Sequence, residues 1–332
     1  MASVSVPSPL FACSSDTRAS FVRPTPAGRA LRRGGARCTS RSRSVTTGPS
    51  LAIQTGKRTY GNRSPGSRRQ RTLRGDEPPR PRGPVATLGA VISAVAVLPQ
   101  PPLLVPELAG AAAAETADVR DAVRDAAAGL AARASRWIAV GADAGGRRTV
   151  APGAVGTFVG FGVDVRVALD TSARVEATAD RDLPLPLLVA GWAAASTGTA
   201  VAIRGELVAP DLPTADCLAL GRALAAEPAA ADDAVGLLVV GDGAATHTEK
   251  APGHLDPRAA PFDATVAAAL ATADTDALAA LDPGLADQLW VAGRAPWQVL
   301  AGAAAGGRWD AELLCSAAPF GVAYHVAFWT RR

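Results

Sequence analysis

The sequence predicts one α/β domain over residues 91–332, built in three layers: a mostly parallel or mixed sheet covered by helices on both faces. Short apolar runs recur along this part of the chain, as expected of strands buried on both faces of a sheet. Between them lie stretches whose apolar residues repeat at helical spacing. Strands that alternate with helices favour this layered architecture. Residues 91–332 contain neither an internal repeat nor a linker, so we expect a single domain.

Seven segments have the composition of strands. They are residues 91–98, 137–140, 163–167, 201–208, 236–240, 309–314 and 322–329. Six segments have helical periodicity: 119–130, 185–195, 216–226, 263–273, 283–291 and 296–305. Arg120 is expected on the solvent side of the first helix. Asp263 and Asp282 are expected to cap the helices that they precede, because an Asp side chain accepts hydrogen bonds from the free amides of a first turn.

Residues 1–90 form a basic leader that we expect to be disordered. They contain 17 of the 34 Lys and Arg residues but only three of the 30 acidic residues, a net charge of +14. Apolar periodicity is absent, so the segment has too little apolar surface to offset the entropy of ordering it. Three interpretations stay open: an organelle transit peptide, a nucleic-acid-binding arm, or upstream sequence translated from a start placed too early.

The composition of the domain excludes several classes of partner. Residues 91–332 contain 17 basic and 27 acidic residues, a net charge of −10, so this part repels phosphate backbones and should not bind nucleic acid. The longest apolar run, 85–98, is shorter than the roughly 20 residues of a membrane helix, so no membrane association is expected. Cys217 and Cys315 have no metal-like spacing and are predicted to be buried thiols. We therefore expect a cytoplasmic protein, or an organelle protein if the leader is a transit peptide.

Three loops that follow predicted strands are the expected location of a ligand site: 99–106, 141–146 and 241–254. The third contains His247 and His254, with Asp242 and Glu249 nearby. Two histidines and a carboxylate form the facial triad of non-haem iron sites. The competing interpretation is two surface histidines in a polar loop. His325 is expected to be a packed histidine within a strand, and the chain has no G-x-S-x-G motif of a serine hydrolase.

Several segments stand out by their order and spacing: 96–107, 241–242, 251–258, 261–263 and 318–324. Together they resemble the catalytic subunit of class III extradiol ring-cleavage dioxygenases, and in particular the Memo-like and uncharacterised actinobacterial branch. The resemblance covers nearly all of 91–332. It implies an α/β sheet between helices and, in active members, Fe(II) bound by histidines and a carboxylate at the strand ends.

Most positions that would bind this iron have lost their ligand. Gln100 stands where the family has the histidine of Pro-His-Pro-Pro, and Ala245 stands where it has the histidine of Gly-Asp-Leu-Ser-His. Asp143 is the counterpart of a histidine after the second strand, and Ala317 lies where a carboxylate often precedes Pro-Phe-Gly-Val. A single carboxylate does not hold Fe(II). We therefore expect no metal and no other cofactor.

The leading hypothesis is a catalytically degenerate member of this family that keeps the fold and a cleft for a small molecule. The cleft candidates are Gln100, Asp143, Asp242, His247, Glu249 and His254. One alternative is a metal-dependent, non-haem iron oxidoreductase with a relocated site formed by His247, His254 and Asp143 or Asp242. Another is a non-catalytic interaction protein. Under the leading hypothesis His247→Ala changes stability by no more than about 0.5 kcal/mol, as for an ordinary surface residue.

Overall fold

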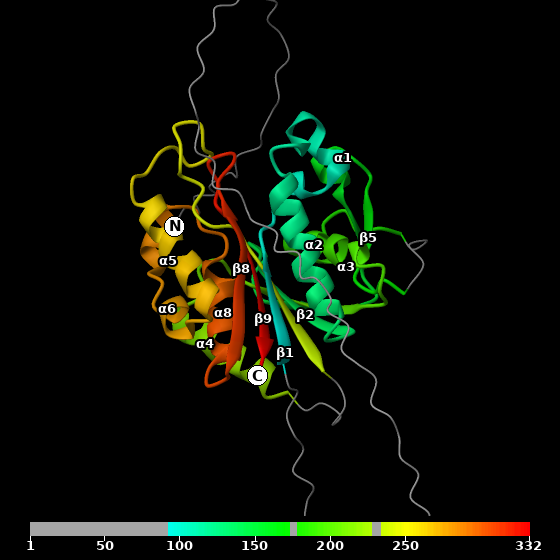
Figure 1. The fold of residues 1–332 in the computed structure, drawn as a ribbon. Helices are drawn as coiled ribbons and strands as arrows, with labels where there is room; N and C mark the ends of the chain where they lie inside the picture. Colours follow the sequence, from blue (N-terminus) through cyan, green and yellow to red (C-terminus); the bar gives the residue numbers. More distant parts are fainter. Residues whose placement is uncertain (1–91, 173–177, 228–233) are drawn as a thin grey trace, which may run out of the picture. The chain divides into compact units, whose positions relative to one another are not determined.

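The computed structural model describes residues 92–172, 178–227 and 234–332, all of which belong to one compact unit. The predicted leader lies outside the described residues. Seven strands form the main sheet, in the order β3-β6-β2-β7-β1-β9-β8. Their bounds are β1 Ile92–Leu98, β2 Arg136–Ala142, β3 Arg148–Val150, β6 Ala202–Val208, β7 Val235–Val240, β8 Trp309–Ala317 and β9 Tyr324–Arg331. The sheet runs through the middle of Figure 1.

The sheet is mixed, and the loops that follow its parallel strands lie at the same edge. β1, β2, β6 and β7 are parallel to one another, while β3, β8 and β9 pair in the antiparallel sense. The carboxyl ends of the four parallel strands therefore meet at one edge. Because β9 runs the other way, its first residues lie at the same edge.

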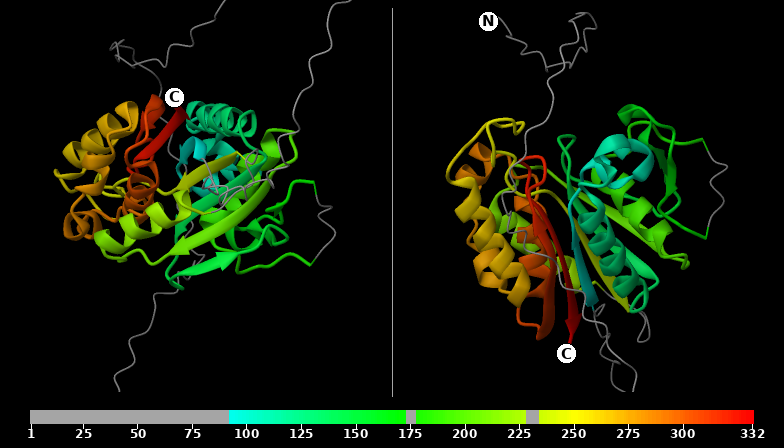
Figure 2. Two further views of the ribbon diagram at one scale, coloured as in Figure 1. Left: turned by 90° about the horizontal axis from the view of Figure 1, so that it is seen from below. Right: turned by 45° about the horizontal axis from the view of Figure 1, so that its top comes forward.

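Helices cover both faces of the sheet, which confirms the three-layer α/β prediction. α2 Ala117–Ala131 and α3 Leu185–Ser196 pack on one face, and α4–α8 pack on the other. The bounds of the second group are α4 Thr214–Ala225, α5 Ala259–Thr272, α6 Thr275–Ala279, α7 Pro283–Gln288 and α8 Arg294–Ala304. Figure 2 shows the two helical layers on either side of the strands.

Strand alternation divides the core into two apolar clusters, one on each face. In β1, Ala94, Ala96 and Leu98 pack on the side of α2 and α3, whereas Val95 and Val97 pack on the side of α4–α8. Both sets are fully buried, which is why the strand has a continuous apolar sequence instead of an alternating one. Among the described residues, no helix is long and apolar enough to span a membrane.

Several short elements were not predicted from the sequence. They are the helices α1 Pro106–Ala109 and α6, the strand β3, the 3₁₀ turns at Pro102–Leu104, Gly110–Ala113 and Phe158–Phe161, and the strand β4 Val155–Thr157, which pairs with β5 Arg166–Ala168 in a separate two-stranded sheet. The half-buried strand expected over 163–167 is reduced to β5, although burial does alternate along the segment. Such elements have three to five residues, too few for periodicity to show.

Three details of the helix predictions have definite outcomes. Asp282 caps α7 as predicted, accepting hydrogen bonds from the amides of Gly284 and Leu285. The prediction for Arg120 was wrong, because its side chain is buried and donates to the carbonyl of Leu104, 2.9 Å away. The cap prediction for Asp263 was also wrong, since α5 begins four residues earlier. Cys217 and Cys315 are buried and are not joined by a disulfide, as predicted.

Candidate functional site

Asp263 lies inside α5, on the stripe of the helix that faces the sheet. The stripe contains Phe262 and Val266, both buried, and Asp263 itself is only 5% exposed. A carboxylate in such a position needs hydrogen-bond donors, because removing an unpaired charge from water costs on the order of several kcal/mol. Asp263 is therefore held by groups that come from other elements.

Three donors converge on Asp263. The amide of Ala244, in the loop after β7, lies 3.2 and 3.3 Å from the two carboxylate oxygens. Nε2 of His247 lies 2.6 Å from Oδ2, and Nε2 of His325 lies 3.1 Å from Oδ1. Gly243 permits this approach, since a Cβ there would collide with Oδ1. The loop 241–254, predicted to be polar, thus packs its first part against α5.

A fourth residue extends this arrangement to the surface. Ser316 on β8 is the cross-strand partner of His325 on β9, and its Oγ lies 3.0 Å from Nδ1 of His325. When Asp263 is ionised and His325 is neutral, Nε2 of His325 donates to Asp263, and Nδ1 accepts the hydrogen bond of the Ser316 hydroxyl. His247, Asp263, Ser316 and His325 are called the Asp263 cluster below.

The Asp263 cluster lines a small open hollow of about 280 Å³. Ser316 is exposed at its rim, His247 is partly exposed, and His325 is 1% exposed at its floor. The remaining wall consists of small side chains: Ala260, Ala264, Ala317, Ala318 and Ala323. The hollow thus combines a polar floor with an alanine wall, which suits a small, partly apolar ligand.

Gln100 and Asp242 meet on the opposite face of the sheet. The amide of Gln100 donates to Oδ1 of Asp242 over 2.7 Å, and the side chain of Tyr324 packs in the core on the α2 and α3 side. Burial raises the pKa of Asp242 to about 7, although the residue keeps some solvent exposure. Burial, helped by the charge of Asp242, raises the pKa of the Tyr324 phenol. Tyr324 and His325 point to opposite faces because neighbouring side chains alternate along a strand.

The other predicted site residues lie apart from both groups. Asp143 forms an ion pair of 3.4 Å with Arg148 on β3. His254 is highly exposed, and its Nδ1 lies 2.8 Å from the carbonyl oxygen of Glu249. His254 is therefore the surface histidine that one interpretation expected. His247 is not, because its ring is bound to Asp263.

The expected metal positions do not supply an iron donor set. Gln100 offers only an amide, Ala245 is a buried alanine, and Ala317 is an alanine in the wall of the hollow. Within the described residues, no group of three or more His, Cys, Asp or Glu side chains could hold a metal ion. His247, His254 and Asp143 each have a different partner and are not brought together.

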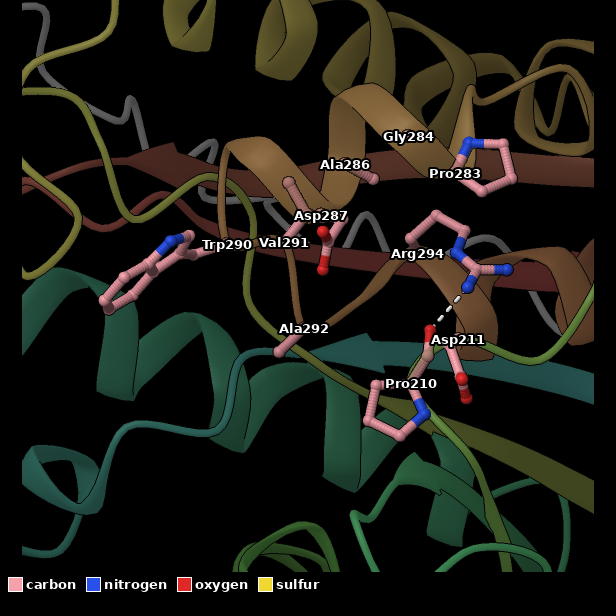
Figure 3. A pocket seen from close by; sticks show the side chains of 10 residues that line it. All are labelled: Pro210, Asp211, Pro283, Gly284, Ala286, Asp287, Trp290, Val291, Ala292 and Arg294. Carbon is pink, nitrogen blue, oxygen red and sulfur yellow. Dashed lines mark hydrogen bonds between the residues drawn. The ribbon is translucent and has the colours of Figure 1, made fainter. Parts of the chain in front are cut away.

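A larger pocket, of about 690 Å³, lies where the chain leaves β6 and where α7 leads into α8 (Figure 3). Its lining residues are Pro210, Asp211, Pro283, Gly284, Ala286, Asp287, Trp290, Val291, Ala292 and Arg294. Figure 3 shows Trp290 at one end of the pocket, Arg294 and Asp211 at the other, and Asp287 between them. We call it the Trp290 pocket.

Trp290 and Arg294 have different roles in this pocket. Trp290 is 59% exposed, the most exposed of the large hydrophobic side chains described, and its φ of 57° lies in the left-handed region that bulky residues avoid. Arg294 is 3% exposed, and its guanidinium donates to the carbonyls of Pro210 and Leu212 and to the side-chain oxygen of Gln298. Arg294 therefore builds the wall, while Trp290 offers a free aromatic surface.

Sequence reasoning missed Asp263, Ser316 and the Trp290 pocket as site features. One signal was present: Asp263 interrupts an apolar stripe of helical spacing, and a charged residue on a buried stripe implies a partner. Ser316 gave no signal, because its relation to His325 depends on strand register. The Trp290 pocket depends on how α7 and α8 pack.

No known family model matches this sequence, and no curated protein is similar to it at a significant level. Among solved structures, the uncharacterised protein JW3007 from Escherichia coli K12 is similar, with 14% sequence identity and a TM-score of 0.42. The match covers 72% of this chain and 99% of that one. A likeness this distant carries no argument about function.

Proposed function

We propose that this protein is a catalytically degenerate relative of the class III extradiol dioxygenase catalytic subunits, and that it binds a small organic molecule without a metal. The observation that carries the proposal is the chemistry at the expected ligand positions. An amide at Gln100 and methyl groups at Ala245 and Ala317 offer no imidazole or carboxylate to Fe(II), which prefers such ligands. The relocated alternative is less well supported, because His247 already donates to Asp263.

The Trp290 pocket is the best candidate for the ligand site. It lies beside the carboxyl end of β6, the edge at which open α/β sheets bind ligands. Its volume falls within the range of small-molecule sites. An exposed indole, with the carboxylate of Asp287 between it and the Arg294 end of the pocket, favours a ligand with a cationic amine, which an aromatic face and a negative charge both attract. The net charge of −10 over residues 91–332 favours a cation further.

The absence of a working iron site is tested by elemental analysis of the purified full chain. We expect far less than one iron per chain, and no oxygen uptake with catechol after Fe(II) is added anaerobically. Iron close to one per chain, together with oxygen uptake on catechols, contradicts the proposal.

The ligand site is tested by thermal melting with benzylamine, and with benzoate as the matched anion. A ligand that binds only the folded state raises the melting temperature, and at 100 times its Kd it adds about 2.7 kcal/mol. We expect benzylamine to raise the melting temperature and benzoate to leave it unchanged. The rise should disappear in Trp290→Ala and Asp287→Asn. It should persist in Phe161→Ala, which removes another exposed aromatic side chain outside the pocket. Equal shifts with both compounds, or a shift that survives Trp290→Ala, would count against this site.

A further inference from the structure

The Asp263 cluster has the connectivity of a nucleophile, a base and a carboxylate. The Ser316 hydroxyl donates to Nδ1 of His325 over 3.0 Å, and Nε2 of His325 donates to Asp263 over 3.1 Å. A serine becomes nucleophilic when an adjacent imidazole accepts its proton and a carboxylate stabilises the imidazolium that forms. The imidazole is turned the opposite way from that of the serine proteases, whose Nε2 faces the serine. Both ring nitrogens can accept a proton, so the chemistry is the same.

Asp263 and His325 are buried while Ser316 is exposed, as nucleophilic catalysis by a serine requires. Asp263 and His325 are buried, at 5% and 1%, so water does not weaken their interaction. Ser316 is exposed and opens into the hollow of about 280 Å³. A purely structural Asp–His pair would need neither a hydroxyl on the second ring nitrogen nor a hollow in front of it.

His247 contacts the carboxylate oxygen of Asp263 that His325 does not use. Its Nε2 lies 2.6 Å from Oδ2 of Asp263, and the amide of Ala244 donates to the same carboxylate. These donors hold Asp263 in one orientation, with Oδ1 directed at His325. Asp263 and His247 are thus positioning residues, while Ser316 and His325 face the hollow in which a substrate would react.

We propose that Ser316 is a nucleophile activated by His325 and that the hollow accepts a small carboxylic ester. In the first step Oγ of Ser316 bonds to the carbonyl carbon, its proton passes to Nδ1 of His325, and the ester C–O bond breaks as the leaving alkoxide takes that proton. Water then attacks the acyl-serine, gives a proton to His325 and releases the acid, and Oγ regains the proton. The alanine wall, which includes Ala260, Ala264 and Ala323, favours esters whose acyl group is short and apolar.

The test uses the full chain with phenylmethylsulfonyl fluoride, whose sulfur bonds to an activated serine Oγ as fluoride leaves. Intact mass and peptide mapping should find one adduct, on Ser316. Ser316→Ala, an exposed substitution that should fold, abolishes it. His325→Gln keeps hydrogen-bonding groups but supplies no base, and should slow labelling by roughly 100-fold, the range of general-base catalysis.

Ser172 provides the matched control. Its hydroxyl is exposed and bonded to a carboxylate, Asp170, over 2.5 Å, but it has no imidazole partner in the described structure. Ser172→Ala should leave labelling unchanged. The same variants should show the same order of rates with p-nitrophenyl acetate. Labelling of Ser316 no faster than that of Ser172, or labelling that His325→Gln does not slow, overturns the proposal. Neither result bears on the Trp290 pocket, which shares no residue with this hollow.

Discussion

Two carboxylates at the same edge of the sheet have contrasting surroundings. Asp242, which shares its face with the buried Tyr324, accepts one backbone amide, that of Gln100, over 2.7 Å. Asp263, on the other face, accepts hydrogen bonds from two imidazoles and one amide. Burial raises the pKa of Asp242 to about 7, so this group is poised between its neutral and charged forms near neutral pH.

The difference shows that the number of donors, more than depth alone, decides what a buried carboxylate can do. A carboxylate that accepts several hydrogen bonds is held in one orientation and can in turn orient an imidazole. A carboxylate with one donor in an apolar setting takes up a proton more readily and becomes a titrating group. Asp263 therefore has a positioning role, whereas Asp242 is sensitive to pH.

The largest effect is expected for Asp263→Ala. The substitution leaves the amide of Ala244 and the imidazole of His325 without their acceptor in the core, so we expect a loss of about 3 kcal/mol in the free energy of unfolding. Urea denaturation measures this value. The control is Asp310→Ala, which breaks an exposed ion pair with Arg332 and should change stability little. Equal effects of the two variants would remove the distinction between Asp263 and a surface carboxylate.

The contribution of Asp242 to the free energy of unfolding should decrease as the pH rises. Its pKa is about 7 in the folded state against 3.8 for the free group, so the folded state holds the proton more tightly. The resulting stability is fully present below about pH 4 and is lost as the pH rises through 7. Asp242→Asn keeps an oxygen acceptor for Gln100 but has no charge. Between pH 5 and pH 8 the free energy of unfolding of Asp242→Asn should rise relative to that of the wild type by about 2.7 kcal/mol.

Urea unfolding of the wild type and Asp242→Asn at both pH values measures this gain. Asp143→Asn is a suitable control, because Asp143 is paired with Arg148 at the same sheet edge. A constant difference between wild type and Asp242→Asn across this pH range would show that Asp242 is ionised throughout.

The smallest expected effect is the difference in stability between alanine variants of the two histidines in the loop 241–254. His247 donates to the buried Asp263, and His254 is exposed beside Glu249. We expect His247→Ala to cost about 1.5 kcal/mol, the lower end for a hydrogen bond to a charged group, and His254→Ala to stay within about 0.5 kcal/mol. The sequence-based expectation of 0.5 kcal/mol for His247 assumed a surface residue. A thermal melt in which both variants match the wild type would restore that assumption.

Most of the main sheet and its helices could be predicted because their periodicity is long enough to show. β1, β2, β6 and β7 appear as apolar runs, and Asp282 marks the start of α7 through local chemistry alone. The candidate sites were harder. His247 and His254 are seven residues apart and share a loop, which favoured treating them as a pair, yet the structure gives them different partners.

The sequence by itself determined the three-layer architecture, the buried thiols and the lack of an imidazole at Gln100 and Ala245, because each depends on residue type or on local period. Only the tertiary structure decided which side chains meet. The contact between Ser316 and His325 depends on the register of β8 and β9, and their link to Asp263 depends on how α5 packs against the sheet. Asp263 and His325 are 62 residues apart in the chain, and no local pattern encodes a contact over such a separation.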